Sequence, residues 1–284
     1  MRRSSSVLLW SILGTSLLGG CVWYAALHED RGGILTVSFL DVGQGDAVLI
    51  DTPSGRQVLV DGGPDSSVLR ELPRVMPWWD RSIDVVVATH PDADHIGGLI
   101  DVLERFEVST IVRSGVHGET ALADIFEKRA REEGAQLLFA ERGQVIDLGK
   151  GARLEILFPD RDTPRVETNV GCVVARLVYG ETSFMLPCDT VSAVETYLAR
   201  LDGERLKSTV LKAAHHGSKT SSSPVFVGYV APEYAVYSRG CGNSYGHPHA
   251  QTVATFARFT IPTLDTCEEG TITFISDGIH VTYQ

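Results

Sequence analysis

The run THPDADH, residues 89–95, places four side chains of the types that bind metal ions within six positions. His90, Asp92, Asp94 and His95 follow the apolar run IDVVVA, which predicts a strand buried on both faces. A strand that enters a tight loop points successive side chains around one spot, so the four should converge. Such a set could serve two adjacent divalent ions, which activate water and neutralise both oxygens of a displacement. A helix cap and loop histidines would explain two of these residues but not four.

One segment cannot complete two metal sites, so further ligands must come from other parts of the chain. Each candidate belongs to a polar cluster that follows a predicted strand: Asp61 in VLVDGG, Asp189 in FMLPCD, His215 and His216 in VLKAAHH, and His247 and His249 in NSYGHPH. Each is weak alone, because Asp189 could cap a helix predicted from about residue 191 and His216 could hydrogen-bond a carbonyl. Together they predict a rim at which polar strand ends meet.

The surrounding sequence predicts the elements that position these residues. From residue 34, three short β-rich runs separated by GQG and PSG indicate an antiparallel meander. Helical spacing begins at about residue 94, and strands and helices then alternate in two similar halves. Hairpins are predicted to turn at Gly180 and Glu181 and at an Asp-Gly pair near the C-terminus. This order predicts an α/β fold with two mixed sheets packed face to face and helices outside, in one domain over residues 34–284.

Residues 1–29 predict a membrane anchor or a signal segment. Arg2 and Arg3 precede an uncharged apolar run of 21 residues from Val7 to Leu27, enough to cross a hydrocarbon core of about 30 Å as a helix. The alternative is a cleaved signal with a lipidated Cys21; the anchor is favoured because the apolar run continues past that cysteine. Both place the rest of the chain on the exported side of the membrane.

The chain is acidic, with 25 Lys and Arg against 36 Asp and Glu and a formal net charge of −11. An acidic surface argues against tight, nonspecific binding of nucleic acid by a broad basic face. The sequence leaves open whether Lys212, Lys219 and Arg239 form a local basic groove.

Four cysteines beyond Cys21 fit an oxidising compartment, and none has the CxxC spacing of a zinc knuckle. Cys241 and Cys267 both follow predicted strands joined by one helix, which predicts a disulfide. Cys172 and Cys188 would lie nearly opposite on a hairpin and form a second candidate pair, although cross-strand geometry is demanding.

Several motifs together resemble the metallo-β-lactamase-fold domain of ComEC-type competence proteins, and more closely its standalone, membrane-anchored relatives. They are FLDVGQGDAVLI, LVDGGPD, THPDADHIGG, TNVG, LPCDT, LKAAHHGSKTSS and YGHPH. The resemblance runs from Leu35 to Tyr283 in the same motif order. It implies a four-layer αββα sandwich with a binuclear metal site at one edge, in agreement with the elements expected from the residues alone.

The resemblance implies metal-ligand roles for seven residues: His90 and Asp92 for one ion, Asp94 and His95 for a second, Asp189 for both, and His215 or His216 for the second. His215 is favoured over His216 because it lies nearer the strand end. Asp94 and Asp189 are the catalytic candidates.

Other residues are implied to support this site. Asp61 would orient the loop at residues 89–95 through hydrogen bonds. Asn169 falls where many members of the wider superfamily have a histidine ligand. Four residues are implied to contact the substrate: Lys212, Ser218, Tyr245 and His247. Ser218 could instead be a loop turn and Tyr245 a packing residue.

Asp92 stands where much of the superfamily has a histidine, so the expected ligand set is rich in oxygen. Oxygen ligands favour Mn²⁺ or Mg²⁺ and nitrogen ligands suit Zn²⁺, so we expect two divalent ions, Mn²⁺ or Zn²⁺.

The resemblance implies an exported phosphodiesterase, a nuclease that acts on DNA through a metal-activated hydroxide and serves DNA uptake. Alternatives are a phosphodiesterase for a cell-envelope ester, such as phosphorylcholine or teichoic acid, and a non-catalytic binding module. β-Lactam hydrolysis is disfavoured, because such enzymes use a histidine-rich zinc site.

Overall fold

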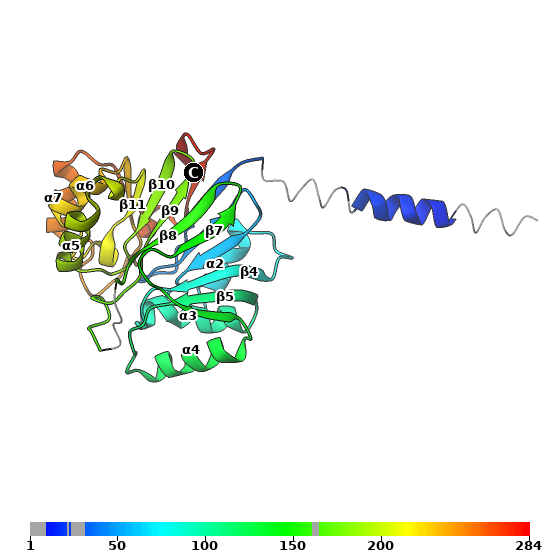
Figure 1. Ribbon diagram of the computed structural model, residues 1–284, viewed down its shortest axis with the longest axis horizontal. Coiled ribbons are helices and arrows are strands. Elements are labelled where there is room, and N and C mark those ends of the chain that lie inside the picture. Colours follow the sequence, from blue (N-terminus) through cyan, green and yellow to red (C-terminus); the bar gives the residue numbers. More distant parts are fainter. Residues whose placement is uncertain (1–9, 22, 24–31, 161–164) are drawn as a thin grey trace, which may run out of the picture.

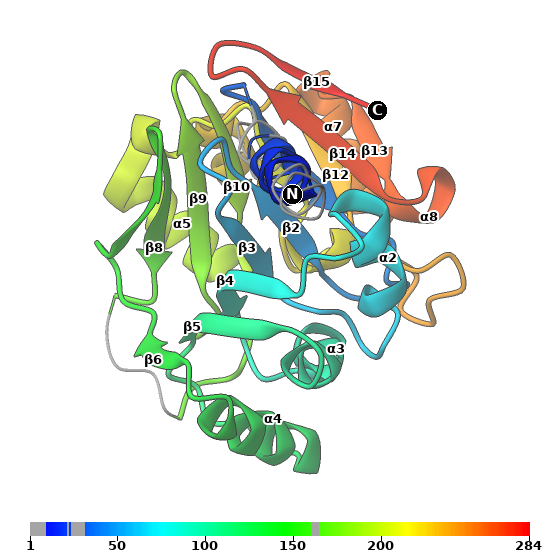
Figure 2. The ribbon, with the colours of Figure 1, turned by 90° about the vertical axis from the view of Figure 1, so that its right-hand side faces the viewer.

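The computed structural model describes residues 10–21, 23, 32–160 and 165–284. Two mixed β-sheets pack face to face, and helices cover the outer side of each sheet (Figures 1 and 2). The fold is therefore the αββα sandwich that the sequence predicts.

The first sheet has eight strands in the order β15-β14-β1-β2-β3-β4-β5-β6. β1, β2 and β3 form the predicted antiparallel meander, and β3 to β6 run parallel. The valines of β4 are buried on both faces, as their continuous apolar run predicts. The strand bounds are β1 (Leu35–Phe39), β2 (Val48–Asp51), β3 (Gln57–Val60), β4 (Ser82–Ala88), β5 (Glu107–Arg113), β6 (Gln136–Phe139), β14 (Ile272–Ser276) and β15 (Val281–Tyr283).

The second sheet has seven strands in the order β13-β12-β11-β10-β9-β8-β7. β9 and β10 form the hairpin predicted to turn at Gly180 and Glu181, and β10 to β13 run parallel. The bounds are β7 (Val145–Gly149), β8 (Ala152–Phe158), β9 (Val174–Tyr179), β10 (Thr182–Leu186), β11 (Val210–Lys212), β12 (Tyr234–Tyr237) and β13 (Thr263–Asp265).

The helices divide between the two outer faces. α2 (Val68–Val75), α3 (Ala93–Leu103) and α4 (Ala121–Glu132) pack on the first sheet, and α5 (Ser192–Asp202), α6 (Pro224–Val230) and α7 (Ala250–Arg258) pack on the second. Shorter elements are α8 (Thr266–Glu269) and the 3₁₀ turns η1 (Gly203–Leu206) and η2 (Ala214–Gly217). A third apolar core lies between the sheets, where Phe274 packs edge-on against Phe39 and Phe184.

Parallel strands bring their carboxyl ends to a common edge, and this explains where the predicted site forms. The ends of β3, β4, β10 and β11 lead directly to Asp61, His90, Asp189 and His215. β2 is antiparallel to β3, so its amino end, preceded by Asp46, lies at the same edge. Leu35 at the start of β1 lies at the opposite end of the sheet, because β1 is antiparallel to β2.

Both predicted disulfides are confirmed, Cys172–Cys188 and Cys241–Cys267, and Cys21 is a free cysteine. Residues 10–21 form a helix. Among the described residues, no helix has both the length and the apolar character needed to span a membrane. The expected span from Val7 to Leu27 lies partly outside the described residues, and the structure does not confirm an anchor.

Candidate metal centre

The loop at residues 89–95, called the metal loop below, connects β4 to α3. Asp92 is the extended residue before the helix, and its carbonyl accepts the backbone N–H of His95 at 3.0 Å. Helix α3 lies directly on the segment that follows β3. A Cβ atom at Gly98 would lie 2.0 Å from the carbonyl oxygen of Gly62, so glycine is needed for this contact. The first turn of α3 is thereby fixed against the end of β3.

Asp61, the residue after β3, holds the metal loop from behind. Its carboxylate accepts the backbone N–H of Thr89 at 2.8 Å, the Thr89 hydroxyl at 2.7 Å and Nδ1–H of His95 at 2.8 Å. The Thr89 oxygen also lies 3.0 Å from Nδ1 of His90. Because Nδ1 of each histidine is engaged on this side, each Nε2 faces away from Asp61.

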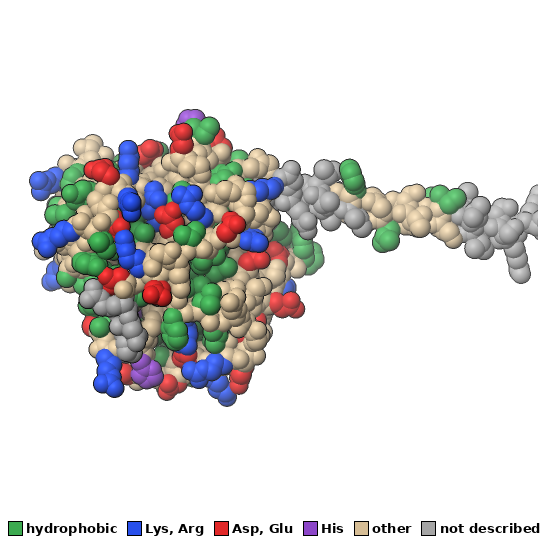
Figure 3. Space-filling model, in the orientation of Figure 1, with side chains coloured by type: hydrophobic (Ala, Val, Ile, Leu, Met, Phe, Trp, Pro, Cys, Tyr) green, Lys and Arg blue, Asp and Glu red, His purple; other side chains and the backbone are tan. Residues whose placement is uncertain are grey.

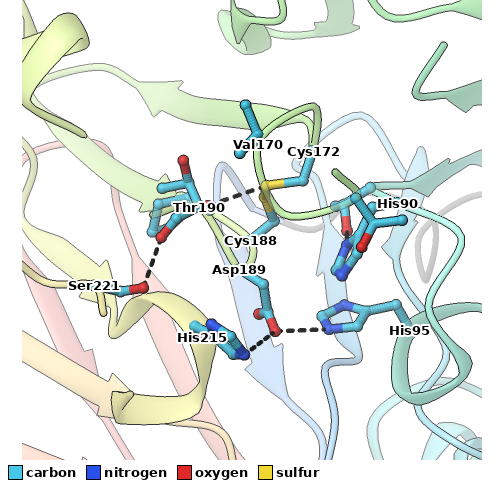
Figure 4. The surroundings of a disulfide bond; sticks show 12 residues. His90, His95, Val170, Cys172, Cys188, Asp189, Thr190, His215 and Ser221 are labelled. Atoms are coloured by element: carbon cyan, nitrogen blue, oxygen red, sulfur yellow. Dashed lines mark hydrogen bonds and ion pairs between the residues drawn. A yellow bond between two sulfur atoms is a disulfide. The ribbon is translucent and has the colours of Figure 1, made fainter. Parts of the chain in front are cut away.

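Four side chains, His95 among them, gather around one point on the side of the metal loop that faces away from Asp61. Ligand atoms of Asp94, His95, Asp189 and His216 all lie within 4.8 Å of one another. The Asp189 carboxylate is at the centre, with Nε2 of His216 at 3.2 Å and Nε2 of His95 at 3.4 Å. Figure 4 shows His95 and His215 directed at Asp189 from opposite sides. Both sheets contribute to this cluster.

His90 and Asp92 lie beside the cluster. The His90 ring centroid is 4.0 Å from that of His95, and its Nε2 is 3.6 Å from the Asp92 carboxylate. Thr168, which sequence reasoning missed, donates to Asp92 at 3.0 Å. The Oδ1 atom of Asn169 is buried and finds no hydrogen-bond partner among the described residues. A second group of potential ligands therefore adjoins the first.

The structure brings His216 rather than His215 to the position beside Asp94 and His95, which favours His216 over the expected His215 as the ligand there. Both His215 and His216 have left-handed backbone, with φ of 51° and 54°, which turns the second histidine inward. His216 is buried and lies 3.3 Å from Asp94, whereas His215 is partly exposed and lies 3.6 Å from Asp189 on the outer side. His216 does hydrogen-bond a carbonyl, that of Ser238 at 2.8 Å, but through Nδ1. Its Nε2 is left to face the cluster.

The donor set fits divalent cations. The Nε2 atoms of His90, His95 and His216 are buried and have no hydrogen-bond partner among the residues described. Buried polar atoms without a partner are rare, and a metal ion is one of the groups that satisfy them. Three imidazole nitrogens converge here with the carboxylates of Asp94 and Asp189, the chemistry that divalent metal sites use.

The carboxylates are held ionised. Burial alone would raise the pKa of Asp94, but the nearby His216 and His95 lower it to about 2. Burial opposes ionisation of Asp189 still more strongly, yet His216, His95 and Lys212 keep its pKa well below the usual range. Burial also lowers the pKa of His90, which is therefore neutral and able to donate its lone pair.

An ion pair that sequence reasoning did not foresee lies beneath Asp189. Lys212 pairs with Asp46, and its Nζ also lies 3.3 Å from Asp189 and 3.2 Å from the carbonyl of Cys188. Both Lys212 and Asp46 are buried. Asp46 lies two residues before the antiparallel strand β2, and the pairing of that strand was the available signal. The burial of Lys212 favours support of Asp189 over the expected contact with substrate.

The other residues expected to contact substrate differ in exposure. Tyr245 is 63% exposed and stacks on His247, with ring centroids 5.6 Å apart. His247 lies 5.8 Å from His215, and burial together with the neighbouring histidines lowers its pKa to about 4, so it is neutral at pH 7. Ser218 is buried and hydrogen-bonds Thr220, which agrees with the alternative role in a loop turn. Tyr245 and His247 thus form one wall beside the cluster.

The Cys172–Cys188 disulfide lies immediately behind Asp189 (Figure 4). Cys188 has left-handed backbone, with φ of 45°, and its carbonyl accepts the backbone N–H of His215 at 3.1 Å. Cys172 follows Asn169 by three residues. The disulfide therefore ties the segment that carries Asn169 to the turn that carries Asp189.

Comparisons with known proteins agree with this geometry. Residues 40–240 match the model of the metallo-beta-lactamase superfamily. The chain is 29% identical over 256 residues to ComE operon protein 3 of Bacillus subtilis, covering 84% of this chain and 32% of that protein. It is 32% identical over 242 residues to the competence protein ComA of Neisseria gonorrhoeae, covering 84% of this chain and 31% of that protein. The chain thus spans about a third of the length of these relatives, which are ComEC-type competence proteins.

Solved structures show the same fold. CmlA, a diiron beta-hydroxylase from Streptomyces venezuelae, superimposes with a TM-score of 0.51 at 13% identity, over 81% of this chain and 52% of that protein. On the matched family model, the sandwich and the clustered ligands at its edge, the chain belongs to the metallo-β-lactamase superfamily.

Proposed function

We propose that this protein is a metal-dependent phosphodiesterase, and specifically a nuclease that acts on DNA. The observation that carries the proposal is the convergence, at the sandwich edge, of ionised carboxylates with buried imidazole nitrogens that lack a hydrogen bond to any residue that the structure describes. The similarity to competence proteins supports DNA as the substrate.

Two groups of residues would hold two divalent ions. Asp94, His95 and His216 would hold one ion and His90 and Asp92 the other, with Asp189 shared between them. When bound, such ions supply Lewis-acid activation of water and neutralise charge on the phosphoryl oxygens. The mixture of carboxylates and imidazoles suits Mn²⁺ and also Zn²⁺.

The surrounding residues keep the ligands in place. Asp61 orients His95 and the metal loop, and Lys212 holds Asp189 ionised from beneath. Tyr245 and His247 form a wall on the solvent side, suited to contact a substrate that reaches the metal centre. Because His247 is neutral, it can donate a hydrogen bond to a phosphate without adding a positive charge beside the metal ions.

The proposed location is the exported side of a membrane. The uncharged apolar run in residues 7–27 and the similarity to competence proteins support it. The chain enters β1 at the end of the sheet opposite to the metal centre, so a tether there would leave the metal centre facing away from the membrane.

The test uses the full chain in detergent, stripped of metal and reloaded separately with Mn²⁺ and Zn²⁺. Single-stranded DNA, double-stranded DNA and bis-p-nitrophenyl phosphate are assayed side by side. We expect metal-dependent DNA cleavage that is lost in Asp94→Ala and kept in Asp101→Ala, a matched control further along α3. Cleavage of the small diester alone would instead indicate an envelope phosphodiesterase. No hydrolysis of any of the three would indicate a non-catalytic binding module.

A further inference from the structure

Of the three basic residues that the sequence left open, Lys212 and Arg239 are engaged by carboxylates and only Lys219 is exposed, so the three do not line a common groove. Lys212 is buried against Asp46, and the Arg239 guanidinium is paired with Asp265 and lies 3.7 Å from Glu268. On the face shown in Figure 3, acidic and basic side chains are interspersed. An acidic chain that binds a polyanion therefore needs a basic site elsewhere.

A cavity of about 710 Å³ adjoins the metal loop and contains such a site. His90 and Pro91 line one side, and the segment that follows β5, helix α4 along its length, the end of β6 and Arg165 line other parts. Gly118 packs tightly on the metal loop, because a Cβ atom there would lie 2.8 Å from Cβ of Pro91. The cavity thus adjoins the metal loop on the side of His90.

The cavity carries an excess of cationic side chains in an acidic protein. Arg113, Arg131 and Arg165 line it, against two carboxylates, those of Asp124 and Glu127. Arg113 and Arg131 both pair with Glu127, so two guanidinium groups share one carboxylate. The Nε atom of Arg113 is buried and has no hydrogen-bond partner within the described part of the chain. An anion that enters the cavity would meet guanidinium groups whose charge a single carboxylate only partly offsets.

An aromatic ring stands beside these arginines. Phe139, at the end of β6, is 58% exposed, and the Arg113 guanidinium carbon lies 4.5 Å from its ring centroid. Arginine next to an exposed aromatic ring is the combination that binds unpaired nucleotides, because the ring stacks on bases while arginine neutralises phosphates. A polyol phosphate offers no base to stack. The volume lies within the range of about 300–1,000 Å³ typical of small-ligand pockets, which suits single nucleotides more than a duplex.

We propose that this cavity is a binding subsite for single-stranded polynucleotide, in which bases stack on Phe139 and phosphates contact Arg113, Arg131 and Arg165. The proposal deepens the proposed function, on which it rests for the choice of substrate. It places the strand across the metal loop, with one phosphate at the metal centre and neighbouring nucleotides in the cavity.

Binding is measured with the full chain in detergent and EDTA, which prevents cleavage. The probe is fluorescein-labelled oligothymidine of twelve nucleotides, followed by fluorescence anisotropy at several NaCl concentrations. We expect the double variant Arg131→Ala/Arg165→Ala to bind about tenfold more weakly. Its plot of log affinity against log salt should become shallower by about 1.4, or about 0.7 for each lost phosphate contact. Phe139→Ala should also bind the oligonucleotide about tenfold more weakly. Its plot of log affinity against log salt should keep the wild-type slope, because base stacking involves no charge.

Matched controls are Arg153→Ala, an arginine paired with Glu155 on β8, and Phe259→Ala, an exposed phenylalanine beside Arg258. Both should bind like the wild type. The inference is overturned if the wild type does not bind the oligonucleotide, if the cavity variants bind as well as the controls, or if a twelve-base-pair duplex is bound as tightly and depends on the same residues. Failure of the proposed nuclease activity is separate, since it would show as absent metal-dependent cleavage with oligonucleotide binding intact.

Discussion

Lys212 and Asp46 form an ion pair that is sealed beneath the Asp189 carboxylate, with 2% and 5% of their side chains exposed. Loss of the ammonium would remove the closest cationic partner of the buried Asp46 carboxylate and one of the partners of Asp189, and uncompensated buried charge is costly. The pair thus links the stability of the fold to the charge of the metal centre.

We expect Lys212→Met to lower the free energy of unfolding by about 3–5 kcal/mol, the range found when one partner of a buried pair is removed. The double variant Lys212→Met/Asp46→Asn should recover part of this loss, because the buried charge of Asp46 is removed together with its partner. Urea denaturation of the metal-free protein measures both. A loss below about 1 kcal/mol in Lys212→Met would contradict a buried, charged pair.

The two disulfides close loops of similar length, with sequence separations of 16 and 26 residues, but they lie in different places. Replacing either pair by serines should cost about 3 kcal/mol of stability. Only Cys172→Ser/Cys188→Ser should also weaken Mn²⁺ binding, by about tenfold, because Cys188 precedes Asp189 and its carbonyl positions Lys212 and His215. Calorimetric titration with Mn²⁺ measures the metal affinity of each double variant and so distinguishes the roles of the two disulfides. Equal affinities in the two double variants would show that the disulfide does not position the site.

Glu195 on α5 is fully buried, and the backbone N–H groups of Ser222 and Ser223 donate to its carboxylate at 2.6 and 2.7 Å. Burial raises its pKa from 4.5 to about 7 despite these hydrogen bonds. The folded state therefore binds this proton more tightly than the unfolded state does. The associated stability is fully present below pH 4.5 and is lost as the pH rises through 7.

Relative to Glu195→Gln, which cannot ionise, the wild type should lose about 3 kcal/mol of unfolding free energy between pH 4.5 and 7.5. Urea denaturation in EDTA at several pH values measures the difference, and the comparison cancels the titration of other groups. Parallel curves for the two proteins would show that Glu195 ionises normally.

The sequence was informative where ligands are local or end a strand. The metal loop could be recognised because four ligand types occur within six residues, and strand ends identified Asp61 and Asp189 because parallel strands share an edge. Asp46 and Thr168 received no role from the sequence, because each is a single polar residue in a loop. Their approach to the site depends on how β2 pairs and how the segment before β9 folds over Asp92.

Residues whose roles depend on orientation could not be assigned from the sequence. The choice between His215 and His216 depends on two consecutive left-handed residues, which no periodicity reveals. Lys212 was expected to contact the substrate. Strand β11, however, is an inner strand of its sheet, between β10 and β12, and the Lys212 side chain lies in a buried anionic environment. The cavity with Arg113 and Phe139 joins the ends of β5 and β6, which become neighbours only in the folded sheet.

Asp61 should affect the metal affinity of the site indirectly, by orienting His95, because its own carboxylate oxygens already accept hydrogen bonds. Its Oδ2 accepts hydrogen bonds from both Thr89 and His95, so Asp61→Asn replaces one acceptor by a donor and leaves at least one partner unsatisfied. Loss of such support of a histidine ligand typically weakens metal binding by about 10- to 100-fold. Asp84→Asn is the matched control, because Asp84 accepts the backbone N–H of Gln57 at 2.8 Å in the same sheet, away from the site. Calorimetric Mn²⁺ titrations of both variants make the comparison, and an affinity loss in Asp84→Asn as large as that in Asp61→Asn would assign the effect to general destabilisation of the sheet.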